Sequence, residues 1–167
     1  MDEKRLFKKI CNLSNKEIAR KYEFLGEGIS REVYSINEDY VIKVAKIDDG
    51  SYQNRVENHV YTHATKSLVK YLCPIVWFEP DRIIMIIMRR AIPLSSLIKD
   101  KYIDLKTIRP EKESYADLNK LTNNFILLAD DIMSTSSWGI YNNEKVLIDY
   151  GCTTYLGDAF YTFFYKW

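Results

Sequence analysis

The feature that most constrains the fold is a lysine at the centre of an apolar strand. The segment Tyr40–Ala45 reads Tyr-Val-Ile-Lys-Val-Ala. Side chains alternate along a strand, so Val41, Lys43 and Ala45 share one face. Burying an unpaired charge on such a face costs several kcal/mol. Either a carboxylate from elsewhere in the chain reaches Lys43, or the strand lies at an edge with Lys43 in water.

Glu57 is the candidate partner for this lysine. After a predicted loop at Asp48–Ser51, four apolar residues recur at four-residue spacing. This spacing is typical of the buried face of a helix. Glu57 flanks that stripe and can point inward, so we expect it to pair with Lys43. The stripe consists of Val56, Val60, Ala64 and Leu68.

The remaining periodicities predict small helices and a sheet, then a helix and a hairpin. Ser14 and Glu17 have the form of a capping box, which begins a helix after a first short one. Four more strands are expected at Tyr22–Leu25, Arg31–Ile36, Ile75–Phe78 and Arg82–Met88. A long helix is expected from about Tyr115 through Leu128, Ala129 and Ile132 to Ser134, followed by a hairpin that turns at Tyr141–Glu144 and returns along Val146–Ile148. Pro93 is expected to break strand pairing.

Composition argues against several classes of function. Lys plus Arg number 24 and Asp plus Glu number 23, so the net charge of +1 gives no sign of a nucleic-acid or membrane partner. Three widely spaced cysteines, Cys11, Cys73 and Cys152, argue against a disulfide framework or a structural zinc site. The longest apolar run, Ile83–Met88, is too short to cross a membrane. These observations predict a cytoplasmic protein (in the host cytoplasm if the chain is viral) with no membrane partner.

A glycine-containing turn precedes the lysine strand. Gly26 and Gly28 begin a segment that matches G-x-G-x-x-G-x-V through Val33, except that Arg31 replaces the third glycine. Glycines let backbone N–H groups approach a phosphate closely. Arg31 either adds positive charge near that phosphate or faces solvent, and we expect solvent.

Two aspartates follow at informative spacing. Asp149 begins an Asp-Tyr-Gly motif after an apolar strand. Ser136 lies thirteen residues before Asp149, and Asp131 lies five residues before Ser136. Asp130 and Asp131 are expected at the end of a helix, where the dipole disfavours negative charge.

These motifs resemble those of the protein-kinase superfamily, and most of all its compact, divergent bacteriophage members, over roughly residues 22–151. The resemblance implies an α+β, minimal two-lobe fold: a five-stranded antiparallel N-lobe sheet with one key helix, and a truncated, mostly helical C-lobe. The single domain would span 1–167, with about 1–90 as the N-lobe and about 91–167 as the reduced C-lobe.

The resemblance also assigns roles to residues. ATP and magnesium (Mg²⁺) would be the ligands. Lys43, fixed by Glu57, would hold the phosphates, Asp131 would orient the acceptor hydroxyl, and Asp149 with Ser136 would hold magnesium. Ser136 departs from the asparagine of the kinase pattern, and Met133 and the missing His-Arg mark further departures. The predicted nucleotide contacts are Gly26, Gly28, Val33, Val41, Lys43, Met88, Arg90 and Ala91, the last two through backbone groups at the adenine edge.

Three functions stay open at this point. The first is transfer of the γ-phosphate of ATP to Ser or Thr hydroxyls of a protein, including the chain itself. The second is a catalytically inactive pseudokinase that inhibits or recruits a phage or host protein partner. The third is a small-molecule phosphotransferase.

The sequence gives weaker evidence of function for the remaining candidate groups. His59 and His63 are four residues apart, as two metal ligands could be, but no third ligand is evident, so a structural role is expected. Cys152 has no identifiable base that would activate its thiol. The C-terminal aromatic residues are expected to pack on the core rather than bind a partner. They are Tyr155, Phe160, Tyr161, Phe163, Phe164, Tyr165 and Trp167.

Overall fold

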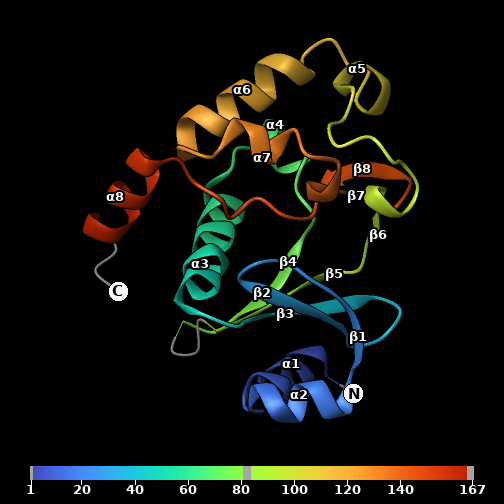
Figure 1. Cartoon of the computed structure of the whole chain (residues 1–167), viewed down its shortest axis with the longest axis vertical. Helices are drawn as coiled ribbons and strands as arrows, with labels where there is room; N and C mark the ends of the chain where they lie inside the picture. The colour runs from blue at the N-terminus through green and yellow to red at the C-terminus, as the bar shows by residue number, and fades with distance from the viewer. Residues whose placement is uncertain (1, 81–83, 165–167) are drawn as a thin grey trace. The chain divides into compact units, whose positions relative to one another are not determined.

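The structure, a computed structural model, describes residues 2–80 and 84–164 of the 167-residue chain (Figure 1). It divides into two units. The first combines the chain up to Asn58 with Pro74–Arg90, and the second combines His59–Cys73 with the chain from Ala91 onward. Each described helix is too short or too polar to cross a membrane.

The first unit is built on a five-stranded antiparallel sheet in the order β1-β2-β3-β5-β4. A helix lies between β3 and β4 in the chain; it starts in this unit and ends in the second. The elements are α1 (Glu3–Cys11), α2 (Asn15–Lys21), β1 (Glu23–Glu27), β2 (Arg31–Ser35), β3 (Tyr40–Ala45), α3 (Asp48–His63), β4 (Ile75–Phe78) and β5 (Met85–Arg89).

The central strand of this sheet, β3, is covered on both faces, which explains why all its residues but Lys43 are apolar. Tyr40, Ile42 and Val44 point to one face and join the main apolar cluster with Phe7 and Ile10 of α1. Figure 1 shows α1 and α2 on this side of the sheet and the start of α3 on the other. The predicted capping box starts α2, because Ser14 and Glu17 exchange their side-chain and backbone hydrogen bonds.

The predicted loop at Asp48–Ser51 is wrong, because these residues form the first turn of α3. Asp48 and Asp49 carry negative charge where the helix dipole favours it. Gly50 lets the helix approach the sheet: a Cβ there would lie 2.3 Å from the carbonyl oxygen of Ser30 and 3.0 Å from Cα of Ala45. The glycine that suggested a loop in the sequence is a close-packing residue.

The second unit contains short helices around a small sheet of order β6-β7-β8. Its elements are α4 (Lys66–Val69), β6 (Ile92–Pro93), η2 (Leu94–Ser96), α5 (Leu105–Ile108), α6 (Ser114–Phe125), α7 (Ala129–Ile132), η3 (Thr135–Ser137), β7 (Trp138–Tyr141), β8 (Glu144–Leu147) and α8 (Tyr155–Phe164). The predicted turn at Tyr141–Glu144 joins β7 and β8, with Asn142 and Asn143 at φ values of 49° and 64°. Positive φ at both central residues is the backbone of a tight hairpin turn, and asparagine tolerates it.

The long helix predicted from about Tyr115 is two helices. α6 ends where Ile126 adopts a left-handed conformation (φ 52°, ψ 39°), and α7 begins at Ala129. The intervening backbone bonds elsewhere: Thr154 N–H donates to Ile126 O, and Leu128 N–H donates to Cys152 O. Tertiary hydrogen bonds therefore override an apolar periodicity that continues through the break.

Two further strand predictions need correction. Pro93 does not prevent pairing, since it lies opposite Gly139 at the edge of the small sheet, where a missing N–H is tolerated. The strand predicted at Arg82–Met88 is β5, which the structure gives as Met85–Arg89; residues 81–83 lie outside the described part of the chain.

The predicted fold class is confirmed. The chain is α+β, with a five-stranded antiparallel sheet and one long helix between its third and fourth strands. This arrangement is compatible with a minimal protein-kinase-like fold.

Candidate functional site

The buried lysine of β3 meets its predicted partner. Lys43 Nζ lies 2.8 Å from Oε1 and 3.0 Å from Oε2 of Glu57. The Glu57 side chain is fully buried and that of Lys43 is 8% exposed. The edge-strand alternative for Lys43 is excluded, because β3 lies between β2 and β5. β3 and α3 thus hold an ammonium and a carboxylate together in the interior of the first unit.

Arg31 is not exposed to solvent, contrary to expectation. Its side chain is 5% exposed, and its guanidinium donates to Oε1 of Glu57 at 3.0 Å and to Oδ1 of Asn54 at 3.1 Å. Alternation along β2 explains the direction. Val33 lies directly opposite Lys43 in the sheet and Arg31 lies opposite Ala45, so all four face α3. Sequence reasoning missed Arg31 and Asn54; the alternation and the three-residue spacing of Asn54 and Glu57 were the available signals.

The glycine-containing turn lies next to this cluster. A Cβ at Gly26 or Gly28 would meet no atom within 4 Å, so packing does not require glycine at either position, but Gly26 adopts φ 158°, which side-chain-bearing residues rarely adopt. The carbonyl of Gly28 accepts from Lys46 Nζ, whose other partner is Glu27. The turn is thus held at its flank while its glycines stay open to an approaching group.

The predicted adenine contacts lie in neighbouring strands. Val41 pairs with Met88 and Val33 pairs with Lys43 across the sheet. Met88 is fully buried, and both valines are half-buried. The Arg90 backbone N–H donates to Asp39 O at 2.8 Å, so any backbone contact to adenine from this position falls to its carbonyl or to Ala91.

The second unit brings the segments of Asp131 and Asp149 together. The carbonyl of Ser137 accepts from the backbone N–H groups of Ile148, at 2.8 Å, and Asp149, at 3.3 Å. Leu127, upstream of Asp131, forms a bridge with Thr153, downstream of Asp149. The loop that follows Asp131 and the segment that runs from the end of β8 to Asp149 therefore lie beside each other. Both aspartates are half-buried.

The predicted helix position of Asp131 is wrong. Asp130 and Asp131 lie inside the single turn of α7, not at the end of a long helix. A single helical turn has little dipole, so it does not disfavour the negative charge of these aspartates. The helix dipole therefore gives no support to Asp131, and its assignment depends only on its spacing from Ser136 and Asp149.

Ser136 is exposed, and its hydroxyl lies 2.8 Å from that of Ser134. The surrounding loop is firmly held: Trp138 Nε1 donates to Ile132 O at 2.7 Å, and Thr135 Oγ1 donates to Asp100 O at 2.6 Å. The Tyr150 ring of the Asp-Tyr-Gly motif is buried, and its hydroxyl donates to Cys73 O. Asp149 thus lies two residues after the end of β8 and directly before a buried, hydrogen-bonded tyrosine.

No protein-only metal centre exists in the described part of the chain, because no three His, Cys, Asp or Glu side chains gather closely enough. Magnesium commonly uses one or two carboxylates and completes its shell with water and substrate phosphates.

The two histidines of α3 stack on each other. Their ring centroids lie 4.1 Å apart, and His59 also makes edge contacts with Phe125 and Tyr161. Burial, with a smaller contribution from His63, lowers the pKa of His59 from 6.5 to about 4. His59 is therefore a neutral packing residue near pH 7.

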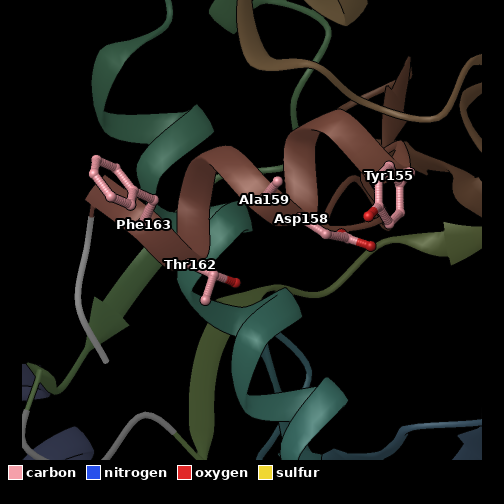
Figure 2. A pocket seen from close by; sticks show the side chains of 5 residues that line it. All are labelled: Tyr155, Asp158, Ala159, Thr162 and Phe163. Carbon is pink, nitrogen blue, oxygen red and sulfur yellow. The ribbon is translucent and has the colours of Figure 1, made fainter.

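A hollow of about 510 Å³ lies along α8, lined by the side chains shown in Figure 2. None of the predicted site residues lines it. It belongs to a helix whose aromatic residues only partly fulfil the packing prediction. Tyr161 is buried, whereas Tyr155 and Phe163 are 85% and 71% exposed; Tyr165 and Trp167 lie outside the described residues. The lining residues are Tyr155, Asp158, Ala159, Thr162 and Phe163.

Comparison with known proteins gives weak structural likenesses. The chain matches no protein-family model and no curated protein. One similar solved structure is the ternary complex of APH(2")-IIa with streptomycin and ATP, with a TM-score of 0.38, 20% identity, and coverage of 61% of this chain and 34% of that one. Another is Cex1p, with a TM-score of 0.48, 18% identity, and coverage of 84% and 28%. The chain therefore spans about a third or less of each of these proteins.

Proposed function

We propose that this chain binds ATP with magnesium and transfers the γ-phosphate to a hydroxyl group of a protein. The observation that carries the proposal is the buried Lys43–Glu57 ion pair on β3 and α3. A lysine held by a carboxylate inside such a sheet is the arrangement that protein kinases use on nucleotide phosphates. Sheet order and the position of α3 between β3 and β4 support the same reading.

Each predicted residue has a role in this proposal. Glu57 fixes the Lys43 ammonium, which binds a phosphate oxygen, while Asp149, with Ser136, supplies oxygen ligands for magnesium. The metal, when bound, neutralises charge on the phosphates. Asp131 accepts a hydrogen bond from the acceptor hydroxyl and orients it. Phosphoryl transfer needs chiefly positioning and charge stabilisation, so these five side chains set the rate.

Ser136 favours a second candidate, a nucleotide-binding pseudokinase that acts through a protein partner. It stands where the kinase pattern has a metal-binding asparagine, and its hydroxyl is engaged with Ser134. A serine reaches less far than an amide carbonyl and would weaken one metal position. The phage-type relationship and cytoplasmic location stay predictions from the sequence.

The test is transfer of labelled phosphate from ATP with magnesium. The wild-type protein is incubated alone, with a cell lysate, and with small hydroxyl-bearing acceptors, beside Lys43→Ala and Asp131→Ala. Arg20→Met, an exposed substitution on α2, is the control and should behave as wild type.

The outcomes separate the candidates. Label on protein that is lost in both variants supports the proposal. Label on small acceptors alone would indicate a small-molecule phosphotransferase. ATP-induced thermal stabilisation without transfer, abolished by Lys43→Ala, would indicate the pseudokinase, and neither transfer nor stabilisation would overturn nucleotide binding altogether.

A further inference from the structure

The start of β2 is attached to α3 by polar contacts along three helix residues. Ser30 Oγ donates to Oε1 of Gln53 at 2.8 Å. Arg31 then reaches Asn54 and Glu57 with separate guanidinium nitrogens. Gln53, Asn54 and Glu57 lie within little more than one turn, so the contacts hold one stretch of α3 against the sheet.

Arg31 supports the Lys43–Glu57 pair rather than competing with it. Lys43 Nζ contacts both carboxylate oxygens of Glu57, and Arg31 adds a third bond to Oε1. A carboxylate oxygen can accept two hydrogen bonds at once. The Glu57 side chain is therefore held from two sides, by ammonium from β3 and by guanidinium from β2.

Burial makes these contacts strong. Asn54 and Glu57 are fully buried, and the Arg31 side chain is 5% exposed. Charge-assisted bonds between buried groups are shorter and stronger than neutral bonds, and the planar guanidinium keeps its donors in fixed directions. A lysine at position 31 could reach one partner but could not span both with this geometry.

We propose that Arg31 is a positioning residue that fixes α3 and Glu57, and through them the Lys43 ammonium, in the phosphate-binding arrangement. Arg31 stands where the G-x-G-x-x-G pattern has its third glycine, and its side chain contacts the helix instead. In kinases the corresponding Lys–Glu pair is made or broken as the helix moves. Here the β2 contacts build the pair into the fold, so α3 needs no separate signal to adopt it. The link to phosphate binding rests on the proposed function.

The experiment measures helix mobility and nucleotide affinity in the same folded variants. Arg31→Met keeps an apolar stem and removes the guanidinium, Arg31→Lys keeps a cation, and Asn54→Ala removes one partner. Arg20→Met on α2 is the matched control, since it makes the same chemical change at an exposed position. Amide hydrogen exchange is followed over residues 50–58, and Mg·ATP affinity is measured by calorimetry.

The proposal predicts that Arg31→Met speeds exchange in residues 50–58 and weakens Mg·ATP binding, each by roughly tenfold, the equivalent of one charge-assisted hydrogen bond. Arg31→Lys and Asn54→Ala should fall between Arg31→Met and wild type, and Arg20→Met should match wild type. A residue with a merely structural role would lower thermal stability without changing the affinity of the protein that stays folded.

Contrary outcomes are distinct. Unchanged exchange and affinity in Arg31→Met, or tighter binding because Glu57 is released to Lys43, would overturn the proposal. If Arg31→Met fails to fold, the Arg31→Lys variant is the test. Amide hydrogen exchange at the wild-type rate over residues 50–58 of that variant would overturn the proposal. If wild type binds no Mg·ATP, the proposed function fails, while the exchange measurement still decides whether Arg31 holds α3.

Discussion

At the residue scale, the molecule depends on a few buried charges that satisfy one another. Lys43 and Arg31 share the carboxylate of Glu57, which has no exposed surface. Removing one member of a buried ionic group leaves the others in a low-dielectric interior, which is more costly than losing a surface pair.

Replacing Glu57 with glutamine tests this dependence with minimal change in shape. The amide keeps the volume of the side chain but leaves two buried cations without their carboxylate. We expect the free energy of unfolding in urea to fall by about 3 kcal/mol. Glu32→Gln, on the same sheet but half-buried, is the comparison and should lose much less. Equal losses would show that the buried group contributes nothing special.

Gly50 gives a second prediction: replacing it with alanine should destabilise the protein, although helix propensity alone predicts stabilisation. Alanine normally improves a helix over glycine by about 1 kcal/mol. Here the Cβ of an alanine at position 50 would lie 2.3 Å from Ser30 O, a backbone atom that cannot move without shifting the chain. We expect Gly50→Ala to lower the melting temperature, while Gly28→Ala, where the space is open, changes it little. A rise in the melting temperature of Gly50→Ala would contradict the close approach.

Sequence reasoning located the residues of the ion pair and missed those around it. Lys43 was identifiable because a cation inside an apolar strand demands a partner, and Glu57 flanked the matching helical stripe. Arg31 was misplaced because a charged residue next to a glycine turn usually faces water. Its true direction follows from strand register, which depends on which strands pair and is not contained in a local pattern.

At the element scale, most strands and the short N-terminal helices follow from local patterns, whereas helix breaks do not. β3, β4, α1 and α2 match their periodicities or caps. The break between α6 and α7 does not, because apolar spacing runs through it and the cause is backbone hydrogen bonding to residues 152–154. Local sequence patterns do not predict hydrogen bonds between segments that are distant along the chain.

The β7–β8 hairpin yields a prediction about turn chemistry. Asn143 adopts φ 64°, which glycine accepts freely and β-branched residues resist. We expect Asn143→Gly to be neutral or stabilising and Asn143→Val to cost about 1–2 kcal/mol in unfolding free energy. Thermal unfolding of the two variants checks this, and equal stability would contradict the turn geometry.

The contact of α3 with α6 and α8 predicts a pH dependence. His59 packs against Phe125 and Tyr161 beside His63, and its pKa is lowered from 6.5 to about 4. The unfolded chain therefore binds a proton at this site more readily than the folded one. Stability is lost as pH falls from about 6.5 toward 4. His59→Phe removes the titrating group and should flatten the melting-temperature profile in that interval; an unchanged slope would contradict this assignment.

At the scale of the whole molecule, the two units contribute different chemistry to the proposed function. The first holds a paired lysine beside an open glycine turn, and the second holds Asp131 and Asp149 on adjoining segments. Fold class was predictable because it needs only the order of helices and strands. The functional assignment goes further, because it gives roles to residues of both units.

Calorimetric titration with Mg·ATP tests that assignment most directly. The wild-type protein and Arg20→Met should bind with the same affinity, whereas Lys43→Met and Asp149→Asn should each bind at least about tenfold more weakly, the equivalent of one lost charge-assisted contact. Circular dichroism spectra are recorded to check that every variant keeps its fold. Absence of binding in wild type, or wild-type affinity in folded Lys43→Met, would contradict the account.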